Sequence, residues 1–220
     1  MGASFSLKYF HASSDWYYLS IAVFQLTTAI SSIIIALLSD AEKLKKETHQ
    51  EASLTDALTE IYNTRFFHLR LDEELTRAVR KADPLTLMYI DVNDFKSIND
   101  NYGHTEGDRV LKDIAAHLLK STRASDVVCR SGGDEFAVIL PDTSHDTGIM
   151  IANRISSGTP AFIMTSPKNG LATPVHLSVG VATFPVDADN RDDLIEYADK
   201  ELYKDKNEFY KNRERVERKR

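Results

Sequence analysis

Three acidic side chains stand where strands are expected to end. Asp91 closes the apolar run "LTLMYIDV", and Asp134 and Glu135 follow two glycines in "RSGGDEFAVIL". If these strands are neighbours in one sheet, the carboxylates meet at its edge, where their repulsion is costly unless a cation lies between them. Oxygen ligands favour Mg²⁺ or Mn²⁺ over zinc, and Mg²⁺ keeps positions open for substrate phosphates. The pattern therefore predicts phosphoryl or nucleotidyl transfer.

The glycine pair fits the same chemistry. Gly132 and Gly133 lack a Cβ, which allows a sharp turn and the close approach of a ligand. A glycine pair followed by acids is also common in ordinary hairpin turns, so turn chemistry alone would explain it. The combination with Asp91 on a separate strand is what favours a catalytic site.

The elements that must position these residues alternate along the chain. Helices are predicted at 64–81, about 108–120, 146–156 and 191–206, and strands at 85–92, 127–130, 136–140 and 176–184. The strand at 85–92 is apolar on both sides, as in a central strand covered on both faces. This order predicts an α/β (α+β) domain with a mixed central sheet, a central hairpin and a βαββαβ kernel.

Composition narrows the class of protein. The 220 residues suffice for one ordinary globular domain with a short attachment. A formal net charge of -6 argues against a nucleic-acid polymer as partner. Cys129 is the only cysteine, which excludes an intrachain disulfide and a thiolate zinc site.

The N-terminal part is expected to lie outside this domain. After a segment at 1–15, residues 16–39 contain no charged residue and predict a transmembrane or dimerisation helix. Aromatic residues at its start and lysines after its end favour a membrane protein with a cytoplasmic C-terminal side. The alternative is a cytoplasmic protein in which this helix is buried.

A charged stretch joins this long N-terminal helix to the domain at 54–220. Residues 40–53, "DAEKLKKETHQEAS", lack glycine and proline and predict a helical stalk. Leu44 is its only large aliphatic residue, so a short coiled coil would need help from neighbouring segments.

Several motifs together resemble one family. "RSGGDEF" resembles the signature of the GGDEF family, the diguanylate cyclases. Further family motifs follow the family's order: "DALT" at 56–59, "DVNDFKSIND" at 91–100, "NYGHTEGD" at 101–108, "LSVGVA" at 177–182 and "ADKELYKDK" at 198–206. The similarity covers about residues 54–206.

The resemblance implies a bacterial enzyme that joins two GTP molecules into cyclic di-GMP and releases two pyrophosphates. It implies a palm-like nucleotidyl cyclase fold with two Mg²⁺ or Mn²⁺ ions per half-site. Asp91, Asp134 and the backbone carbonyl of Val92 match metal ligands of the family. Glu135 matches the acid that helps to deprotonate the 3′-hydroxyl or binds the second metal.

Substrate-binding residues are also implied by the resemblance. Asn99 and Asp108 match residues that select guanine, and Asp108 argues for GTP over ATP because a carboxylate accepts from two guanine donors. Lys96 and Lys206 match lysines that meet the triphosphate. Without the resemblance, Asn99 could be a turn former and Asp108 a helix cap.

An inhibitory site is implied as well. Arg123 and Asp126 form an R-x-x-D motif, which in the family marks a site where the product cyclic di-GMP binds. Arg154 falls where a helper arginine from a second subunit is often found. Arginine suits this task because its planar fork meets phosphate and guanine bidentately. A random R-x-x-D pair is more often a surface ion pair of little weight.

Some positions depart from the family pattern. Asn93 stands where a second aspartate is more usual, which removes one charge near the metals, and activity is expected to survive. Thr64 interrupts the customary "N-R-R" after "DxLT".

The largest departure follows Lys206. There the family's glycine-arginine is replaced by Phe209 and Tyr210. An arginine contact to phosphate is therefore lost or supplied by Lys211 or Arg213.

A homodimer is expected, because one domain holds one GTP whereas the product needs two joined symmetrically. The alternative reading is a catalytically silent GGDEF domain that acts as a receptor for GTP or cyclic di-GMP. The intact signature loop favours the enzyme. A related cyclase that accepts ATP is disfavoured by Asp108.

Overall fold

The computed structural model describes residues 16, 20–21, 23–39, 54–158, 163–165 and 172–218. The chain divides into two compact units, Met1–Ser53 and Leu54–Arg220. Residues 23–39 of the first unit are helical, whereas the segment at 1–15 and the predicted stalk at 40–53 lie outside the described residues. Among the described residues, no helix combines the length and the apolar character needed to cross a membrane. Membrane association of residues 16–39 stays a prediction.

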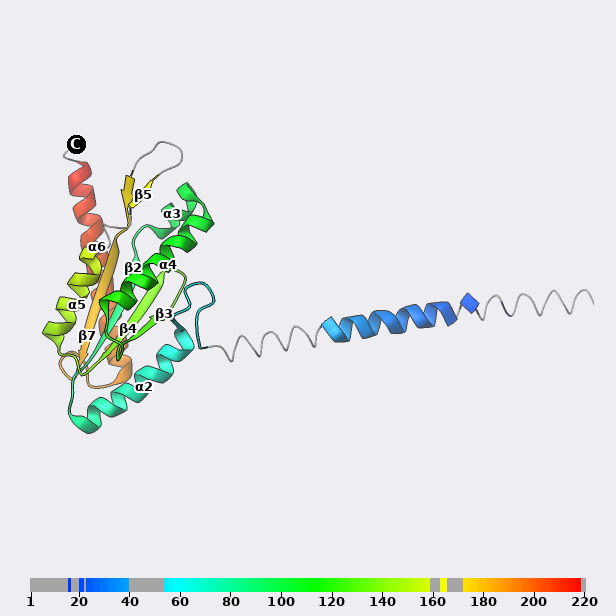
Figure 1. Ribbon diagram of the computed structural model, residues 1–220, viewed down its shortest axis with the longest axis horizontal. Helices are drawn as coiled ribbons and strands as arrows, with labels where there is room; N and C mark the ends of the chain where they lie inside the picture. Colours follow the sequence, from blue (N-terminus) through cyan, green and yellow to red (C-terminus); the bar gives the residue numbers. More distant parts are fainter. Residues whose placement is uncertain are drawn as a thin grey trace, which may run out of the picture. The chain divides into compact units, whose positions relative to one another are not determined.

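A five-stranded mixed sheet forms the centre of the second unit (Figure 1). In the order β1-β3-β4-β2-β7, its strands are Tyr62–Asn63, Val127–Arg130, Glu135–Pro141, Leu85–Val92 and Leu177–Phe184. The central strand β2 is antiparallel to both β4 and β7, while β1 is parallel to β3. The strands β2, β3, β4 and β7 with their connecting helices form the expected βαββαβ kernel, so the predicted fold class is confirmed.

Helices cover both faces of the sheet. They are α2 (Thr64–Lys81), α3 (Phe95–Tyr102), α4 (His104–Ser121), α5 (His145–Gly158) and α6 (Arg191–Glu217). The helices α4 and α5 pack on one face in a core that includes Met88 and Ile90, and α2 and α6 pack on the other with Leu85 and Leu87. Successive β2 side chains thus enter opposite cores, as the apolar run predicted.

Most predicted element boundaries agree with the structure. The helix α2 and the strands β2 and β3 match the predictions, and β4 and β7 differ by about one residue at their ends. The prediction for α4 was wrong at its start, because the helix begins at His104. The helix α3, the short strand β1 and a separate two-stranded hairpin, β5 (Ile163–Thr165) with β6 (Ala172–Pro174), were not predicted.

The helix α6 runs well past the predicted end near Lys206, to Glu217. No glycine or proline follows Lys206 in this helix, so nothing in the sequence interrupts the helical backbone. Its middle part lies very close to β7, since a Cβ on Gly180 would overlap backbone atoms of Ala198 and Leu202. This close packing brings the second half of α6 to the end of β2.

Candidate active site

The three acidic residues meet at one end of the sheet. The β2–β4 register sets Asp91 opposite Glu135, and directly paired residues project from the same face. The Val92 backbone N–H donates to the Asp134 carbonyl oxygen at 3.2 Å, which extends the ladder to the turn. The strands β2 and β4, which carry these acids, are therefore neighbours, as the sequence analysis required.

The carboxylates share a crowded electrostatic environment. Burial raises the pKa of Asp91, although Lys206 opposes the rise by donating from Nζ to Asp91 Oδ1 at 2.8 Å. Partial burial, followed by the charges of Asp91 and Asp134, raises the pKa of Glu135. Ionised carboxylates held this way favour a nearby positive charge.

The donor chemistry of this edge fits a hard divalent cation. The groups that would hold it are the carboxylates of Asp91, Asp134 and Glu135 and the carbonyl of Val92, all of them oxygen ligands. Within the part of the chain that the structure describes, no three His, Cys, Asp or Glu side chains already form a group that could hold a metal ion. The Lys206 ammonium supplies a positive charge at Asp91.

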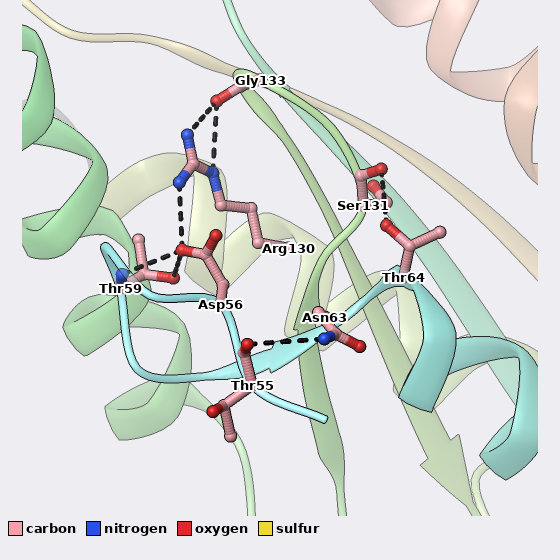
Figure 2. Close-up of polar contacts among 8 residues, drawn as sticks. All are labelled: Thr55, Asp56, Thr59, Asn63, Thr64, Arg130, Ser131 and Gly133. Carbon is pink, nitrogen blue, oxygen red and sulfur yellow. Dashed lines mark hydrogen bonds and ion pairs between the residues drawn. The ribbon is translucent and has the colours of Figure 1, made fainter. Parts of the chain in front are cut away.

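The turn between β3 and β4 is held by a guanidinium (Figure 2). Arg130 donates to the Gly133 carbonyl oxygen from Nε at 3.2 Å and from Nη2 at 2.6 Å, and from Nη1 to Asp56 Oδ1 at 3.0 Å. The Thr59 amide and hydroxyl donate to the same Asp56 oxygen at 2.9 and 2.6 Å. The "DALT" motif thus anchors the arginine that fixes the turn.

These hydrogen-bond partners lower the pKa of the Asp56 carboxylate. Burial acts to raise its pKa, but the bonds from Thr59 and Arg130 outweigh burial and hold the pKa below its ordinary value of 3.8. Asp56 is therefore ionised at neutral pH. Sequence analysis assigned no role to Arg130, although a charged residue at a strand end inside the signature could have indicated one.

A second link holds the same turn. The Thr64 hydroxyl donates to the Ser131 carbonyl oxygen at 2.9 Å, and the Asn63 side-chain amide donates to the Thr55 carbonyl oxygen at 3.4 Å (Figure 2). The parallel pairing of Asn63 with Arg130 places these contacts side by side. Thr64, which departs from the family pattern, thus contacts the signature turn directly.

The two glycines of the signature differ in their surroundings. A Cβ on Gly132 would lie 2.6 Å from Glu135 Oε2, which is closer than real Cβ contacts. A Cβ on Gly133 would meet nothing within 4 Å. Gly132 therefore makes room for the Glu135 carboxylate, while the space at Gly133 is open to a ligand.

A pocket of about 500 Å³ adjoins the acidic edge. Its walls include Val92, Lys96, Asp134, Lys206 and Tyr210. The structure therefore places both predicted phosphate-binding lysines in the same pocket as two of the predicted metal ligands, Val92 and Asp134. The carboxylates of Asp94 and Asp100 also line this pocket. Two ammonium groups among carboxylates suit an anionic ligand that carries divalent cations.

The predicted guanine-selecting residues lie where α3 meets α4. A Cβ on Gly107 would overlap Asn99 Oδ1, so the Asn99 side chain lies directly against the residue before Asp108. Gly103 is the N-cap of α4, which excludes the alternative that Asp108 caps this helix. The structure thus brings Asn99 close to the Asp108 backbone, and their role in base selection stays a prediction.

The predicted inhibitory residues gather at the C-terminal end of α4. Asp126 Oδ2 accepts from the Arg123 amide at 2.7 Å, and the Asp126 amide donates to the Arg123 carbonyl at 3.0 Å. Arg154 Nη2 donates to the Ser121 carbonyl oxygen at 2.6 Å within the same chain. The R-x-x-D motif forms a closed turn with an exposed arginine, and product binding there stays a prediction.

Asn93 and the end of α6 make contacts that sequence reasoning did not anticipate. The Asn93 amide and the Ser178 hydroxyl, both buried, exchange hydrogen bonds of 3.0 and 3.1 Å, which direct Asn93 toward β7. Tyr210 and Arg213 contact Asp94, at the start of α3. Of the two cations proposed to replace the family's arginine, Arg213 thus contacts Asp94, three residues after Asp91.

A mixed βαββαβ sheet with clustered acids at the end of paired strands defines a palm domain of the nucleotidyl cyclase type. Residues 53–212 match the family described as diguanylate cyclase, GGDEF domain. The chain belongs to the GGDEF domain family.

Characterised relatives agree with this membership. The response regulator PleD of Caulobacter vibrioides is 38% identical over 159 residues, which cover 71% of this chain and 34% of PleD. The diguanylate cyclase DosC of Escherichia coli is 34% identical over 179 residues, which cover 81% of this chain and 38% of DosC. The chain therefore spans only about a third of the length of these two curated relatives.

Solved structures show the same fold. The isolated GGDEF domain of PA1120 (TpbB or YfiN) from Pseudomonas aeruginosa is 36% identical with a TM-score of 0.65, and the match covers 70% of this chain and 89% of that chain. The GGDEF domain of DgcB from Caulobacter crescentus, solved in complex with c-di-GMP, is 25% identical with a TM-score of 0.64. That match covers 70% of this chain and 91% of the DgcB chain.

Proposed function

We propose that the protein is a diguanylate cyclase that condenses two GTP molecules into cyclic di-GMP and two pyrophosphates. The observation that carries this proposal is the meeting of Asp91, Asp134 and Glu135 beside a pocket lined by Lys96 and Lys206. Names and structures of relatives within the family support the same reaction.

Each half of the reaction is an in-line displacement at the α-phosphorus of one GTP. The 3′-hydroxyl oxygen of the other nucleotide forms the new P–O bond, and the bond to pyrophosphate breaks. Divalent cations at the carboxylate edge would neutralise charge on the attacking and leaving oxygens. Glu135, which is paired with Asp91 across the two strands, is the proposed acceptor of the hydroxyl proton.

The remaining residues position the substrate. Lys96 and Lys206 are proposed to bind phosphate oxygens, with Lys206 moving from Asp91 to the triphosphate when cations bind at the carboxylate. Asn99 and Asp108 are proposed to accept from the guanine edge. An adenine base would leave Asp108 without its two donors, which favours GTP.

The product requires two domains facing each other, so the proposed active form is a homodimer. The helix at 16–39 and the segment at 40–53 would raise the effective concentration of the paired domains. Attachment of residues 16–39 to the bacterial inner membrane, with the catalytic domain in the cytoplasm, belongs to the same proposal.

A direct assay tests the reaction. The full chain is incubated with Mg²⁺ and labelled GTP or ATP, and the products are identified by mass. Cyclic di-GMP from GTP alone is expected. Asp134→Ala should abolish turnover, while Asp189→Ala, which removes an exposed aspartate away from this edge, should not. Binding of GTP or cyclic di-GMP without turnover would instead identify a silent receptor.

Feedback inhibition is a separate part of the proposal. Cyclic di-GMP is proposed to bind at Arg123 and Asp126, with Arg154 close to this turn through its bond to Ser121. Arg123→Ala should therefore relieve product inhibition and leave the initial rate nearly unchanged. Initial rates measured with and without added cyclic di-GMP test this, and unchanged inhibition would remove the assigned site.

A further inference from the structure

The last turns of α6 form a contact with the loop that leaves β2. Tyr210 and Arg213 stand one helical turn apart, and both contact the same carboxylate. The Tyr210 hydroxyl donates to Asp94 Oδ1 at 3.3 Å, and Arg213 Nη1 forms an ion pair with Asp94 Oδ2. Asp94 lies two residues after Val92 and two before Lys96, so this contact adjoins the proposed nucleotide site.

Asp94 separates two pockets. It lines the pocket of about 500 Å³ that also contains Lys96, Lys206 and Tyr210. It also lines a neighbouring pocket of about 680 Å³, and Arg213 belongs to the lining of that second pocket. Arg213 therefore reaches the Asp94 carboxylate from outside the pocket proposed for the triphosphate, while Tyr210 lies inside it.

The charge of Asp94 would work against an anionic substrate. A carboxylate in the wall of a phosphate pocket repels the triphosphate, and this repulsion is strong where solvent is partly excluded. The Asp94 side chain is 36% exposed and the Arg213 side chain 53%, so the pair is only partly screened by water. Asp100 and Asp134 line the same pocket. An ion pair formed from behind therefore offsets the Asp94 share of the repulsion and leaves the pocket open.

The Tyr210 hydroxyl is suited to a different task. Its bond to Asp94 is long at 3.3 Å, and Arg213 satisfies the other carboxylate oxygen. The hydroxyl can therefore transfer its hydrogen bond to a phosphate oxygen in the same pocket without leaving Asp94 unpaired. Hydrogen bonds from neutral donors to phosphate oxygens are charge-assisted and short.

We propose that the C-terminal turns of α6 complete the nucleotide site. Arg213 is a positioning residue that neutralises Asp94, and Tyr210 contacts the substrate by donating to a phosphate oxygen of a bound nucleoside triphosphate. This inference rests on the proposed function for the identity of the ligand. It also accounts for the missing arginine after Lys206, because the continuous helix carries Tyr210 at that position and Arg213 one turn beyond it.

A binding experiment with the full chain separates charge compensation from a structural role. The probe is the α,β-methylene analogue of GTP with Mg²⁺, titrated calorimetrically against wild type, Arg213→Gln, Asp94→Asn and the double variant. We expect Arg213→Gln to raise Kd by about tenfold, equivalent to about 1.4 kcal/mol. The double variant should return to within about twofold of wild type, because the repelling charge is also gone.

Controls test whether position or overall charge matters. Lys211→Gln removes one exposed positive charge from the same helix, and it should change Kd by less than about twofold. Arg213→Lys keeps the charge and should stay within about threefold of wild type. Raising the salt concentration should shrink the Arg213→Gln defect, which loss of packing would not do. Tyr210→Phe should raise Kd by about threefold to tenfold through loss of one hydrogen bond.

The outcomes distinguish this inference from the proposed function. If wild type binds the analogue and makes cyclic di-GMP from GTP, yet Arg213→Gln binds normally or Asp94→Asn fails to rescue it, only the α6 assignment is overturned. An equal loss in Lys211→Gln overturns it too. If wild type fails to bind the analogue, the proposed function and this inference fall together.

Discussion

Replacing Arg130 by alanine removes the group that joins the "DALT" segment to the signature turn. Three hydrogen bonds are lost, one to Asp56 and two to the Gly133 carbonyl oxygen. The Arg130 side chain is 14% exposed and the Asp56 side chain 24%, so water replaces these bonds incompletely. Asp56 keeps its two bonds from Thr59.

The magnitude follows from these contacts. A hydrogen bond to a charged group contributes about 1.5–3 kcal/mol, and the three bonds share one guanidinium, so their effects do not add. We expect Arg130→Ala to lower the free energy of unfolding by about 2–3 kcal/mol. Release of the Gly133 carbonyl should also let Asp134 move, which we expect to lower kcat by about tenfold to a hundredfold.

The assay must report on the catalytic domain alone. The single tryptophan, Trp16, lies in the other unit, whereas the single cysteine, Cys129, is fully buried beside Arg130. Pulse labelling of Cys129 along a urea gradient therefore follows unfolding of this domain. Arg109→Ala is the matched control, because its two ion pairs lie on the exposed surface of α4 and should contribute less than about 1 kcal/mol.

A double-mutant cycle completes the test. Asp56→Ala and Arg130→Ala should show a coupling free energy of about 1–2 kcal/mol, since each removes the partner of the other. The reasoning is refuted if Arg130→Ala unfolds like the Arg109→Ala control and its kcat stays at the wild-type value. It is also refuted if stability falls but the two substitutions are additive.

Three further predictions concern the same domain. Gly132→Ala should lower kcat by at least about tenfold with little change in urea midpoint, because the added Cβ displaces the Glu135 carboxylate; unchanged kcat would show that the space is not needed. Burial raises the pKa of Cys129 to about 12, so the native thiol should resist a disulfide reagent at neutral pH and react after unfolding, and rapid native labelling would contradict its burial. Because the folded pKa of Asp56 lies below 3.8, its stabilising contribution is present above that pH and is lost as pH falls through the folded value. Asp56→Asn should therefore flatten the acid limb of a stability-versus-pH curve, and an unaltered limb would assign the acid sensitivity to other groups.

The convergence of the acids could be predicted because it follows from strand periodicity. The continuous apolar run identified β2 as a buried strand, and the glycine-rich hairpin identified β4. Their acids would meet if the two strands were neighbours, and the observed register confirms that they are. The residue types then fixed the expected chemistry. These inferences use local patterns that sequence preserves.

The supporting contacts could not be predicted in the same way. Arg130 and Asp56 are 74 positions apart, Thr64 and Ser131 are 67 apart, and no periodic pattern reports a single hydrogen bond over such separations. The extension of α6, in contrast, was open to prediction, since no glycine or proline follows Lys206 to end the helix. Tertiary packing, rather than local propensity, decides the long-range contacts.

The pairing of Asp91 with Glu135 depends on the register of β4 against β2. Alternate residues of a strand face opposite sides of the sheet. A shift of β4 by one residue would turn the Glu135 side chain to the face covered by α4 and α5, while the Asp91 side chain would remain on the face covered by α2 and α6. An insertion or deletion of one residue within β4 would therefore separate the acids and would also turn the apolar side chains beyond it to the wrong core. The hydrophobic packing of β4 thus holds the two acids in register.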